Sequence, residues 1–207
     1  MSSPRLDYRV VKRGIDIAAS GLLLVASLPV QAVVAALVAA KMGRPVLFRQ
    51  PRPGLHGEVF TLLKFRTMLS VDPSRGLATD AERLTRLGTI LRTTSLDELP
   101  SLWNVFRGDM SIVGPRPLLV DYLPLYSAEE ARRHEVRPGI TGLAQVNGRN
   151  GLSWKERFEL DVRYVDELSA ALDARILLDT FRAVVRREGI NEAGQATMSR
   201  FEGTDAS

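Results

Sequence analysis

The chain lacks several residues and motifs on which common enzyme classes depend. Its 207 residues include no cysteine and only two histidines, His56 and His134, which lie far apart in the sequence. Disulfides, thiolate chemistry and Cys/His metal clusters are therefore excluded, and the composition is typical of a reducing compartment. The usual glycine-rich nucleotide loops and the H-E-x-x-H zinc pair are also absent.

The charge balance is basic. With 28 Lys and Arg against 24 Asp and Glu, the formal net charge is +4 and the sequence pI is about 9.7. Such a surface suits phosphates, nucleic acid or anionic lipid head groups equally well. The length allows one domain with an appendage.

A long apolar segment covers residues 14–40, in which only Asp16 and Gln31 are strongly polar. It is too long for a secretory signal and has no clear cleavage site. Its length favours a membrane segment over a buried helix of a soluble protein. One transmembrane span and a re-entrant anchor are both possible.

Pro29, near the middle of this segment, predicts a break because it removes a helical hydrogen bond. Each half then reaches at most ~25 Å, which is less than the ~30 Å hydrocarbon core. Basic residues flank both ends, at Arg9, Lys12, Arg13, Lys41 and Arg44. Because the positive-inside rule keeps both ends cytoplasmic, we favour a helix–break–helix that enters and leaves by one face.

Residues 46–68 predict a β-hairpin, with a Pro/Gly-rich turn at residues 51–57. Its end, K-F-R-T-M, carries Lys64 and Arg66. Such cations are ordinarily solvated, but beside a phosphate site they would be ligands.

Three helices are predicted further along the chain. One begins with a capping box at Thr79 and Glu82 and directs three leucines inward, and two more cover residues 154–167 and 172–187. The last is amphipathic, so it either faces the core or lies in a membrane interface. The Gly-rich residues 138–150 form either a ligand loop or a plain connector.

The most informative stretch is residues 93–117, which begins with the carboxylate pair Asp97-Glu98. The pattern Ser95-x-x-Glu98 is also a plain capping box, and both interpretations remain open. Pro100 favours a helix start near Asp97, because proline is tolerated in the first turn. The predicted helix places Leu99, Leu102, Trp103 and Phe106 on one face and stops at Gly108.

The stretch ends with Arg116 between two prolines in G-P-R-P. Carboxylates combined with cations suit phosphoryl chemistry. An aspartate can attack phosphorus, Arg and Lys can take up oxygen charge, and Mg²⁺ can bridge carboxylate and diphosphate. The membrane segment indicates a lipid phosphate as one substrate.

Four motifs occur in order: K-F-R-T-M, S-L-D-E-L-P-x-L-W-N-V, G-D-M-S-x-V-G-P-R-P and R-P-G-I-T-G-L-A-Q-V-N-G-R-N. Together they resemble the bacterial monotopic phosphoglycosyl transferases, the "bacterial sugar transferase" enzymes that start glycoconjugate assembly on polyprenyl phosphate. The resemblance runs from about Tyr8 to about Gly203 and implies the minimal family form. L-L-V-D-Y-L-P-L-Y-S and the tail G-I-N-E-A-G-Q-A-T-M-S-R-F-E-G resemble the subgroup acting on UDP-N,N′-diacetylbacillosamine.

The expected fold is mainly helical α+β. It comprises a re-entrant anchor over residues 1–42, a cytosolic catalytic domain over 43–190 with a β-hairpin and an interfacial amphipathic helix, and a polar tail over 191–207. The expected location is the cytoplasmic face of the bacterial inner membrane, in the inner leaflet, with no nucleic-acid partner.

The resemblance implies that Asp97 attacks the β-phosphorus of a UDP-sugar, with an N-acetylated amino or diamino sugar, and expels UMP. Polyprenyl (undecaprenyl) phosphate then attacks the phosphosugar–enzyme. Glu98 would be a general base or support Mg²⁺, with Asp97 as the metal residue. The motif positions expected near substrate phosphates are Lys64, Arg66, Arg92, Arg116, Arg137, Asn147, Arg149 and Asp161.

One departure concerns the membrane break, where the family usually has Ser-Pro and this chain has Ser27-Leu28-Pro29. Ser27 could then satisfy the kink only by bonding a different carbonyl. Two alternatives remain open: direct transfer in a ternary complex, and a non-catalytic membrane adaptor that presents a basic surface.

Overall fold

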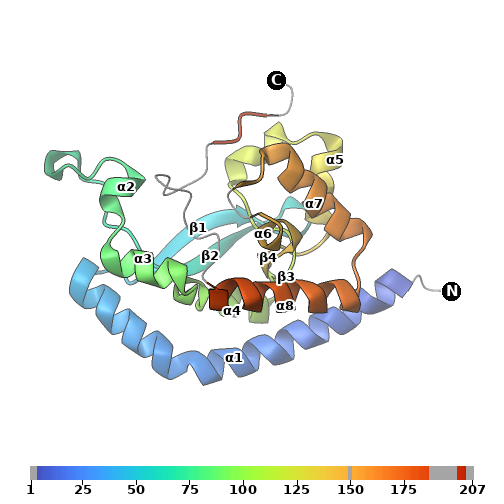
Figure 1. Cartoon of the computed structure of the whole chain (residues 1–207), viewed down its shortest axis with the longest axis horizontal. Coiled ribbons are helices and arrows are strands. Elements are labelled where there is room, and N and C mark those ends of the chain that lie inside the picture. Colours follow the sequence, from blue (N-terminus) through green and yellow to red (C-terminus); the bar gives the residue numbers. More distant parts are fainter. Residues whose placement is uncertain (1–3, 149–150, 187–199, 204–207) are drawn as a thin grey trace.

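The computed structural model describes residues 4–148, 151–186 and 200–203 (Figure 1). A single long helix, α1 (Pro4–Met42), runs along one edge of the molecule, and all other elements lie on one side of this helix. Its most apolar window has a mean hydropathy of 2.4 with 11% of it buried, so by length and composition the helix could cross a membrane. The chain is mainly helical with two small sheets, as expected.

The prediction that the helix is interrupted at Pro29 is wrong, because α1 continues through this residue. The helix bends instead (Figure 1), which is the usual effect of an internal proline. Ser27 Oγ donates to the Leu23 carbonyl at 2.6 Å and accepts from Gln31 Nε2 at 2.9 Å. The serine thus bonds a backbone carbonyl one turn earlier, in the way expected for the shifted Ser-Leu-Pro order.

One face of α1 is held against the rest of the chain by polar as well as apolar contacts. Asp16 is 3% exposed, and its carboxylate accepts the Ile112 backbone N–H at 3.1 Å. Near the start of the helix, Lys12 Nζ and Tyr8 OH bond Asp173 of the last helix at 2.6 and 2.7 Å. The opposite face leaves apolar side chains exposed, among them Val10, Ile15, Leu22, Val25, Leu28, Val33 and Leu37.

The predicted hairpin is confirmed. Strands β1 (Leu47–Pro53) and β2 (Val59–Phe65) pair antiparallel, with Leu47 opposite Phe65, and a 3₁₀ turn η1 (Leu55–Gly57) joins them. A further 3₁₀ turn, η2 (Pro73–Arg75), follows in the next loop.

The helix predicted to begin at Thr79 is divided into α2 (Asp80–Arg83) and α3 (Arg86–Thr93). The Thr79–Glu82 capping box is present, but Leu84 adopts an extended conformation and Thr85 caps a second helix. The division places α3 so that its C-terminus leads into the carboxylate pair.

That pair lies in a separate 3₁₀ turn, η3 (Leu96–Glu98), followed by α4 (Ser101–Arg107). The prediction of one helix starting near Asp97 is therefore wrong: Pro100 stands at the N-cap of α4, and Ser95 makes no side-chain cap. Gly108 ends α4 with φ 103°, as predicted. Trp103 and Phe106, which were predicted on the apolar face, are 46% and 40% exposed, so this face is only partly buried.

The second sheet joins two distant motifs. β3 (Ser111–Val113) pairs in parallel with β4 (Gly139–Thr141), and the chain between them forms η4 (Val120–Leu125), α5 (Ala128–Ala131) and η5 (Arg132–Glu135). A Cβ on Gly139 would lie 2.1 Å from the Gly114 nitrogen, and one on Gly114 would lie 2.3 Å from the Arg137 oxygen. Glycine is required at both positions because the two backbones touch.

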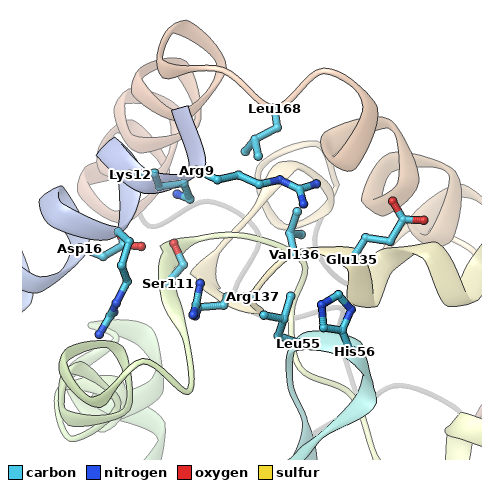
Figure 2. A pocket seen from close by; sticks show the side chains of 11 residues that line it. Arg9, Lys12, Asp16, Leu55, His56, Ser111, Glu135, Val136, Arg137 and Leu168 are labelled. Atoms are coloured by element: carbon cyan, nitrogen blue, oxygen red, sulfur yellow. The ribbon is translucent and has the colours of Figure 1, made fainter. Parts of the chain in front are cut away.

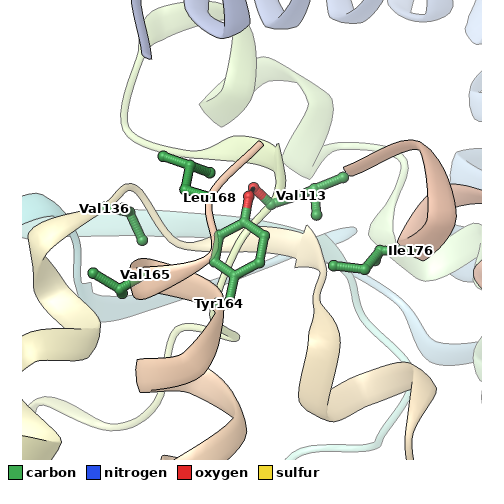
Figure 3. Packing of buried hydrophobic residues seen from close by; sticks show 6 residues of the cluster. All are labelled: Val113, Val136, Tyr164, Val165, Leu168 and Ile176. Carbon is green, nitrogen blue, oxygen red and sulfur yellow. Dashed lines mark hydrogen bonds between the residues drawn. The ribbon is translucent and has the colours of Figure 1, made fainter. Parts of the chain in front are cut away.

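The C-terminal part consists of α6 (Leu143–Val146), α7 (Trp154–Asp166) and α8 (Ala170–Arg186). Figure 3 shows Tyr164 of α7 at the centre of a core cluster with Val113, Val136, Val165, Leu168 and Ile176. Its hydroxyl lies 3.0 Å from the Val113 carbonyl oxygen and 2.7 Å from Asp173 Oδ1.

Helix α8 has two apolar faces. Ile176 is 1% exposed in the core, whereas Leu177, Leu178 and Phe181 are 43%, 48% and 67% exposed. The helix therefore turns one apolar face to the core and leaves a second one exposed, so it does not face the core alone. Helix α4 contacts α1 where Arg13 donates to the Val105 and Phe106 carbonyls, and α8 contacts the start of α1 through Asp173.

Candidate active site

The carboxylate pair is positioned by contacts between α4 and β2. Ser101 Oγ donates to the Leu63 carbonyl at 2.7 Å, and Asn104 accepts the Leu63 N–H at 3.1 Å. Asn104 also donates to the Thr61 carbonyl at 2.8 Å. These bonds fix the turn preceding α4 against the strand that carries Lys64.

The turn itself begins at Ser95, whose φ of 56° and ψ of 17° are left-handed. A non-glycine residue rarely adopts this conformation, and such residues concentrate at functional sites. The sharp turn separates α3 from the pair, so the two carboxylates are not part of a longer helix.

Glu98 is held by two cations. Lys64 Nζ donates to Glu98 Oε1, and Arg116 Nη2 donates to the same oxygen at 3.3 Å. Burial raises the pKa of Glu98, but the charges of Lys64 and Arg116 outweigh it and lower this pKa to about 2. Glu98 is therefore anionic throughout the physiological range.

Asp97 lies in a different environment although it is the adjacent residue. Asp97 is only 8% exposed, and no group among the described residues donates a hydrogen bond to its carboxylate. Burial, followed by the charge of Glu98, raises the pKa of Asp97 to about 6, and nearby cations offset part of this rise. At neutral pH Asp97 is thus a mostly ionised carboxylate to which none of the described residues donates a hydrogen bond.

Further cations surround the pair. Arg92, at the end of α3, donates from Nε to Thr67 Oγ1 at 3.1 Å, and its charge is among those that lower the pKa of Asp97. Arg52 donates to the Pro117 carbonyl at 3.2 Å, and burial and then the charge of Arg116 lower the pKa of Arg52 to about 10. The sequence analysis did not select Arg52, which lies in the hairpin with no motif of its own.

The structure brings Lys64, Arg92 and Arg116 to the carboxylate pair, but it places other predicted residues elsewhere. Arg66 donates to the Met42 and Gly43 carbonyls, where it neutralises the C-terminus of α1. Asn147 Nδ2 bonds the Leu143 carbonyl at 2.8 Å within its own helix. Arg149 lies outside the described residues.

Arg137 lies at the C-terminal end of α4, whereas the carboxylate pair precedes the N-terminus of this helix. Its Nε donates to the Gly108 carbonyl at 2.8 Å, and its side chain lines a separate pocket near the start of α1. No hydrogen bond or ion pair joins Arg137 to Asp97 or Glu98 in the described part of the chain.

Asp161 acts on the site through Arg133. The two side chains are 3% and 1% exposed and are joined by hydrogen bonds of 2.7 and 3.0 Å. Arg133 Nη2 also donates to the Arg116 carbonyl at 2.7 Å. This buried pair therefore supports the backbone of Arg116, and Arg133 is a positioning residue that the sequence analysis missed, because its helix has the pattern of a polar surface.

A metal site would have few protein ligands. Within the described ranges no group of three or more His, Asp or Glu side chains could hold a metal ion. Glu98 is engaged by two cations, whereas the Asp97 oxygens accept no hydrogen bond from the described side chains. Such a donor set fits Mg²⁺, which commonly uses one or two carboxylates plus substrate phosphates and waters.

Comparison with known proteins gives a consistent result. The family model described as bacterial sugar transferase matches residues 7–187. The chain is 53% identical over 196 residues to an uncharacterized sugar transferase, EpsL, of Bacillus subtilis, covering 94% of this chain and 97% of that protein.

Two relatives carry names that state a reaction. One is a UDP-glucose:undecaprenyl-phosphate glucose-1-phosphate transferase of Caulobacter vibrioides, 40% identical over 188 residues, covering 86% of this chain and 70% of that protein. The other is an undecaprenyl-phosphate glucose phosphotransferase of Komagataeibacter xylinus, 40% identical over 190 residues, covering 83% of this chain and 35% of that protein.

Proposed function

We propose a reaction for this chain, which belongs to the bacterial sugar transferase family and is a sugar-1-phosphate transferase. It transfers a sugar 1-phosphate from a UDP-sugar to polyprenyl phosphate through a covalent intermediate on Asp97. The products would be UMP and a polyprenyl diphosphosugar. The observation that carries the proposal is the asymmetry of the pair. Asp97 is buried with no described hydrogen-bond donor, whereas Glu98 is tied to Lys64 and Arg116.

In the first step an oxygen of Asp97 attacks the β-phosphorus of the UDP-sugar. The bond from that phosphorus to the bridging oxygen breaks, and UMP leaves with the electron pair. Lys64 and Arg116 lie where they would take up charge on the phosphoryl oxygens, since both already contact the neighbouring Glu98. Asp97, which accepts no hydrogen bond from the described residues, is better suited to this attack than the ion-paired Glu98.

In the second step an oxygen of polyprenyl phosphate attacks the same phosphorus, and the acyl phosphate bond to Asp97 breaks. The Asp97 carboxylate is restored, so the cycle is balanced without any redox partner. Asp97 would be the protein ligand of a bound Mg²⁺, whose positive charge would reduce the repulsion between the two anions that approach each other.

The exposed apolar side chains of α1, α4 and α8 support a proposal for the membrane arrangement. We propose that α1 enters and leaves the inner leaflet on the cytoplasmic face, with the bend in the membrane. The exposed Trp103, Phe106 and Phe181 would then lie in the interface, where aromatic side chains are favoured. The lipid substrate would reach the site from that side.

The sugar is proposed to be an N-acetylated amino or diamino sugar. Support comes from the resemblance of residues 118–127, around η4, to the diacetylbacillosamine subgroup. The similar C-terminal tail lies largely outside the described residues. The Caulobacter and Komagataeibacter relatives are named for glucose, so a panel of UDP-sugars is the appropriate substrate test.

The decisive experiment omits the lipid acceptor. Wild-type protein incubated with the UDP-sugar and Mg²⁺ should release about one UMP per enzyme and then stop, and the peptide containing Asp97 should gain the mass of a phosphosugar. The Asp97→Asn variant should give no burst and lose about 10³-fold or more in turnover. The control is Glu159→Gln, which removes an exposed carboxylate on α7.

Release of UMP only when polyprenyl phosphate is present, with no adduct, would replace the covalent route by direct transfer. Full activity of the Asp97→Asn variant would exclude Asp97 from the chemistry altogether. Family membership already favours an enzyme over the non-catalytic adaptor.

A further inference from the structure

A second basic site lies away from the carboxylate pair, at the start of α1. Figure 2 shows a pocket between the first turns of this helix and the chain around β3 and η5. Its volume is about 120 Å³, larger than the ~30 Å³ of one liquid water and smaller than the ~300–1,000 Å³ typical of whole-ligand pockets. The pocket therefore suits one small group better than a complete nucleotide sugar.

The lining is cationic. Four of the lining side chains are basic, namely Arg9, Lys12, Arg13 and Arg137, against two acidic ones, Asp16 and Glu135. Both acids are already engaged, Asp16 by the Ile112 N–H at 3.1 Å and Glu135 by Arg132 at 3.3 Å. The pocket thus retains excess positive charge.

Part of that charge is available to a ligand. Lys12 is paired with Asp173, and Arg13 donates to the Val105 and Phe106 carbonyls at 2.7 and 2.9 Å. Arg137 uses its Nε on the Gly108 carbonyl, which leaves its two terminal nitrogens without a hydrogen bond to any described residue. Arg9 likewise has no hydrogen bond or ion pair within the described chain, and Figure 2 shows its side chain reaching across the pocket.

A buried hydroxyl gives independent support. Ser111 is 1% exposed, and its Oγ has no hydrogen-bond partner among the described residues. A buried polar atom without a partner costs about 1–3 kcal/mol, so native proteins rarely leave one unless a ligand or water satisfies it. The same serine lines the basic pocket (Figure 2).

We propose that this pocket binds a phosphate group that is not the one transferred. Two arginine guanidinium groups and a hydroxyl are donors suited to phosphoryl oxygens, and the arginine fork can hold two of them. None of Asp97, Glu98, Lys64 and Arg116 lines the pocket, so the site is separate from the reacting centre. Its position at the polar end of an apolar helix is where a phospholipid head group would lie, and free inorganic phosphate offers the same chemistry.

The test uses the full chain in a phosphorus-free nonionic detergent at constant ionic strength. The thermal midpoint is followed during titration with dihexanoyl phosphatidic acid or with inorganic phosphate, because a ligand of the folded state raises it saturably. The Arg116→Gln variant should keep this response, which would distinguish it from binding at the carboxylate site.

Arg9→Gln and Ser111→Ala should each weaken the apparent affinity about tenfold, the loss expected for one hydrogen bond to a charged group. The matched control is Arg49→Gln, which removes an exposed cation on β1. Arg9 is exposed, so its substitution leaves folding intact.

A response to the short-chain lipid alone assigns the pocket to a lipid head group, and a response to inorganic phosphate alone assigns it to the free ion. A response to both establishes a phosphate site open to either source. Absence of a saturable response would overturn the proposal. So would equal weakening by Arg49→Gln and Arg9→Gln, or an unchanged affinity in the Ser111→Ala variant, since general surface charge would then explain the binding.

Discussion

Replacing Asp97 with asparagine should stabilise the protein while it abolishes turnover. The pKa of Asp97 is raised from 3.8 to about 6, chiefly by burial. Because this folded-state pKa lies above that of the unfolded chain, ionisation of Asp97 opposes folding. At 1.36 kcal/mol per unit, a shift of about two units corresponds to about 3 kcal/mol.

The pH dependence gives the sign of the effect. Below pH 3.8 the carboxyl group is protonated in both states, so Asp97 carries no ionisation penalty. Between pH 3.8 and 6 the unfolded chain loses the proton first, and the stability of the wild type falls relative to that of the Asp97→Asn variant. Above about pH 6 the difference stays constant, because Asp97 is then ionised in both states.

Thermal unfolding in metal-free detergent solution at pH 4, 5, 6 and 7 measures this difference. For a chain of this size, about 2–4 °C per kcal/mol gives an advantage approaching about 6–12 °C for the Asp97→Asn variant at pH 7, and much less at pH 4. Glu159→Gln, at an exposed position, should give no such trend. A difference that does not change with pH, or a more stable wild type at pH 7, would refute the account of Asp97 as a buried carboxylate with a raised pKa.

Three further predictions concern the surroundings of the pair. Arg116→Lys should lower kcat/KM about tenfold or more, because lysine keeps the charge but loses the planar fork; near-normal turnover would remove Arg116 from the phosphate site. Asp161→Asn should cost about 3–5 kcal/mol of stability by leaving Arg133 buried without its counter-charge. A midpoint shift no larger than that of Asp121→Asn, whose ion pair with Arg200 is exposed, would contradict this. The chain has no native cysteine, so single cysteines can be placed at Ser2 and Ser207, both outside the described residues. Both should resist an impermeant thiol reagent in intact cells. Labelling of the cysteine at position 2 alone would establish a spanning topology.

Local signals in the sequence predict local structure well. The hairpin follows from two apolar runs around a Pro/Gly turn, and the cap at Thr79 and the stop at Gly108 have specific backbone causes. Asp97, Glu98, Lys64 and Arg116 were selected as one site from their motifs, and the structure brings them together. The failures at element boundaries share a cause: Leu84 and Pro100 interrupt helices whose apolar periodicity continues past them.

Long-range pairing could not be predicted from the sequence. Asp16 has the pattern of an isolated charge in an apolar helix, but its partner is a backbone N–H of β3, 96 residues later. Arg66 belongs to the K-F-R-T-M motif, yet its guanidinium ends on carbonyls of α1. In both cases the partner is main chain, which carries no residue-specific signal, so motif and periodicity cannot identify it.

The division of roles within the carboxylate pair follows from a conflict between two requirements. Cations are needed near the site to bind a diphosphate, but an ion pair with the nucleophilic carboxylate would lower its nucleophilicity. Glu98 resolves this conflict, since it has one more methylene than Asp97 and accepts both Lys64 and Arg116 on one oxygen. Together with Arg92, three positive charges oppose the two carboxylates and leave a net positive charge for an incoming phosphate. Asp97 is thereby left ionised at neutral pH, buried and without a hydrogen-bond donor among the described residues. Its unfavourable ionisation in the folded protein is the property on which its proposed role as the nucleophile rests.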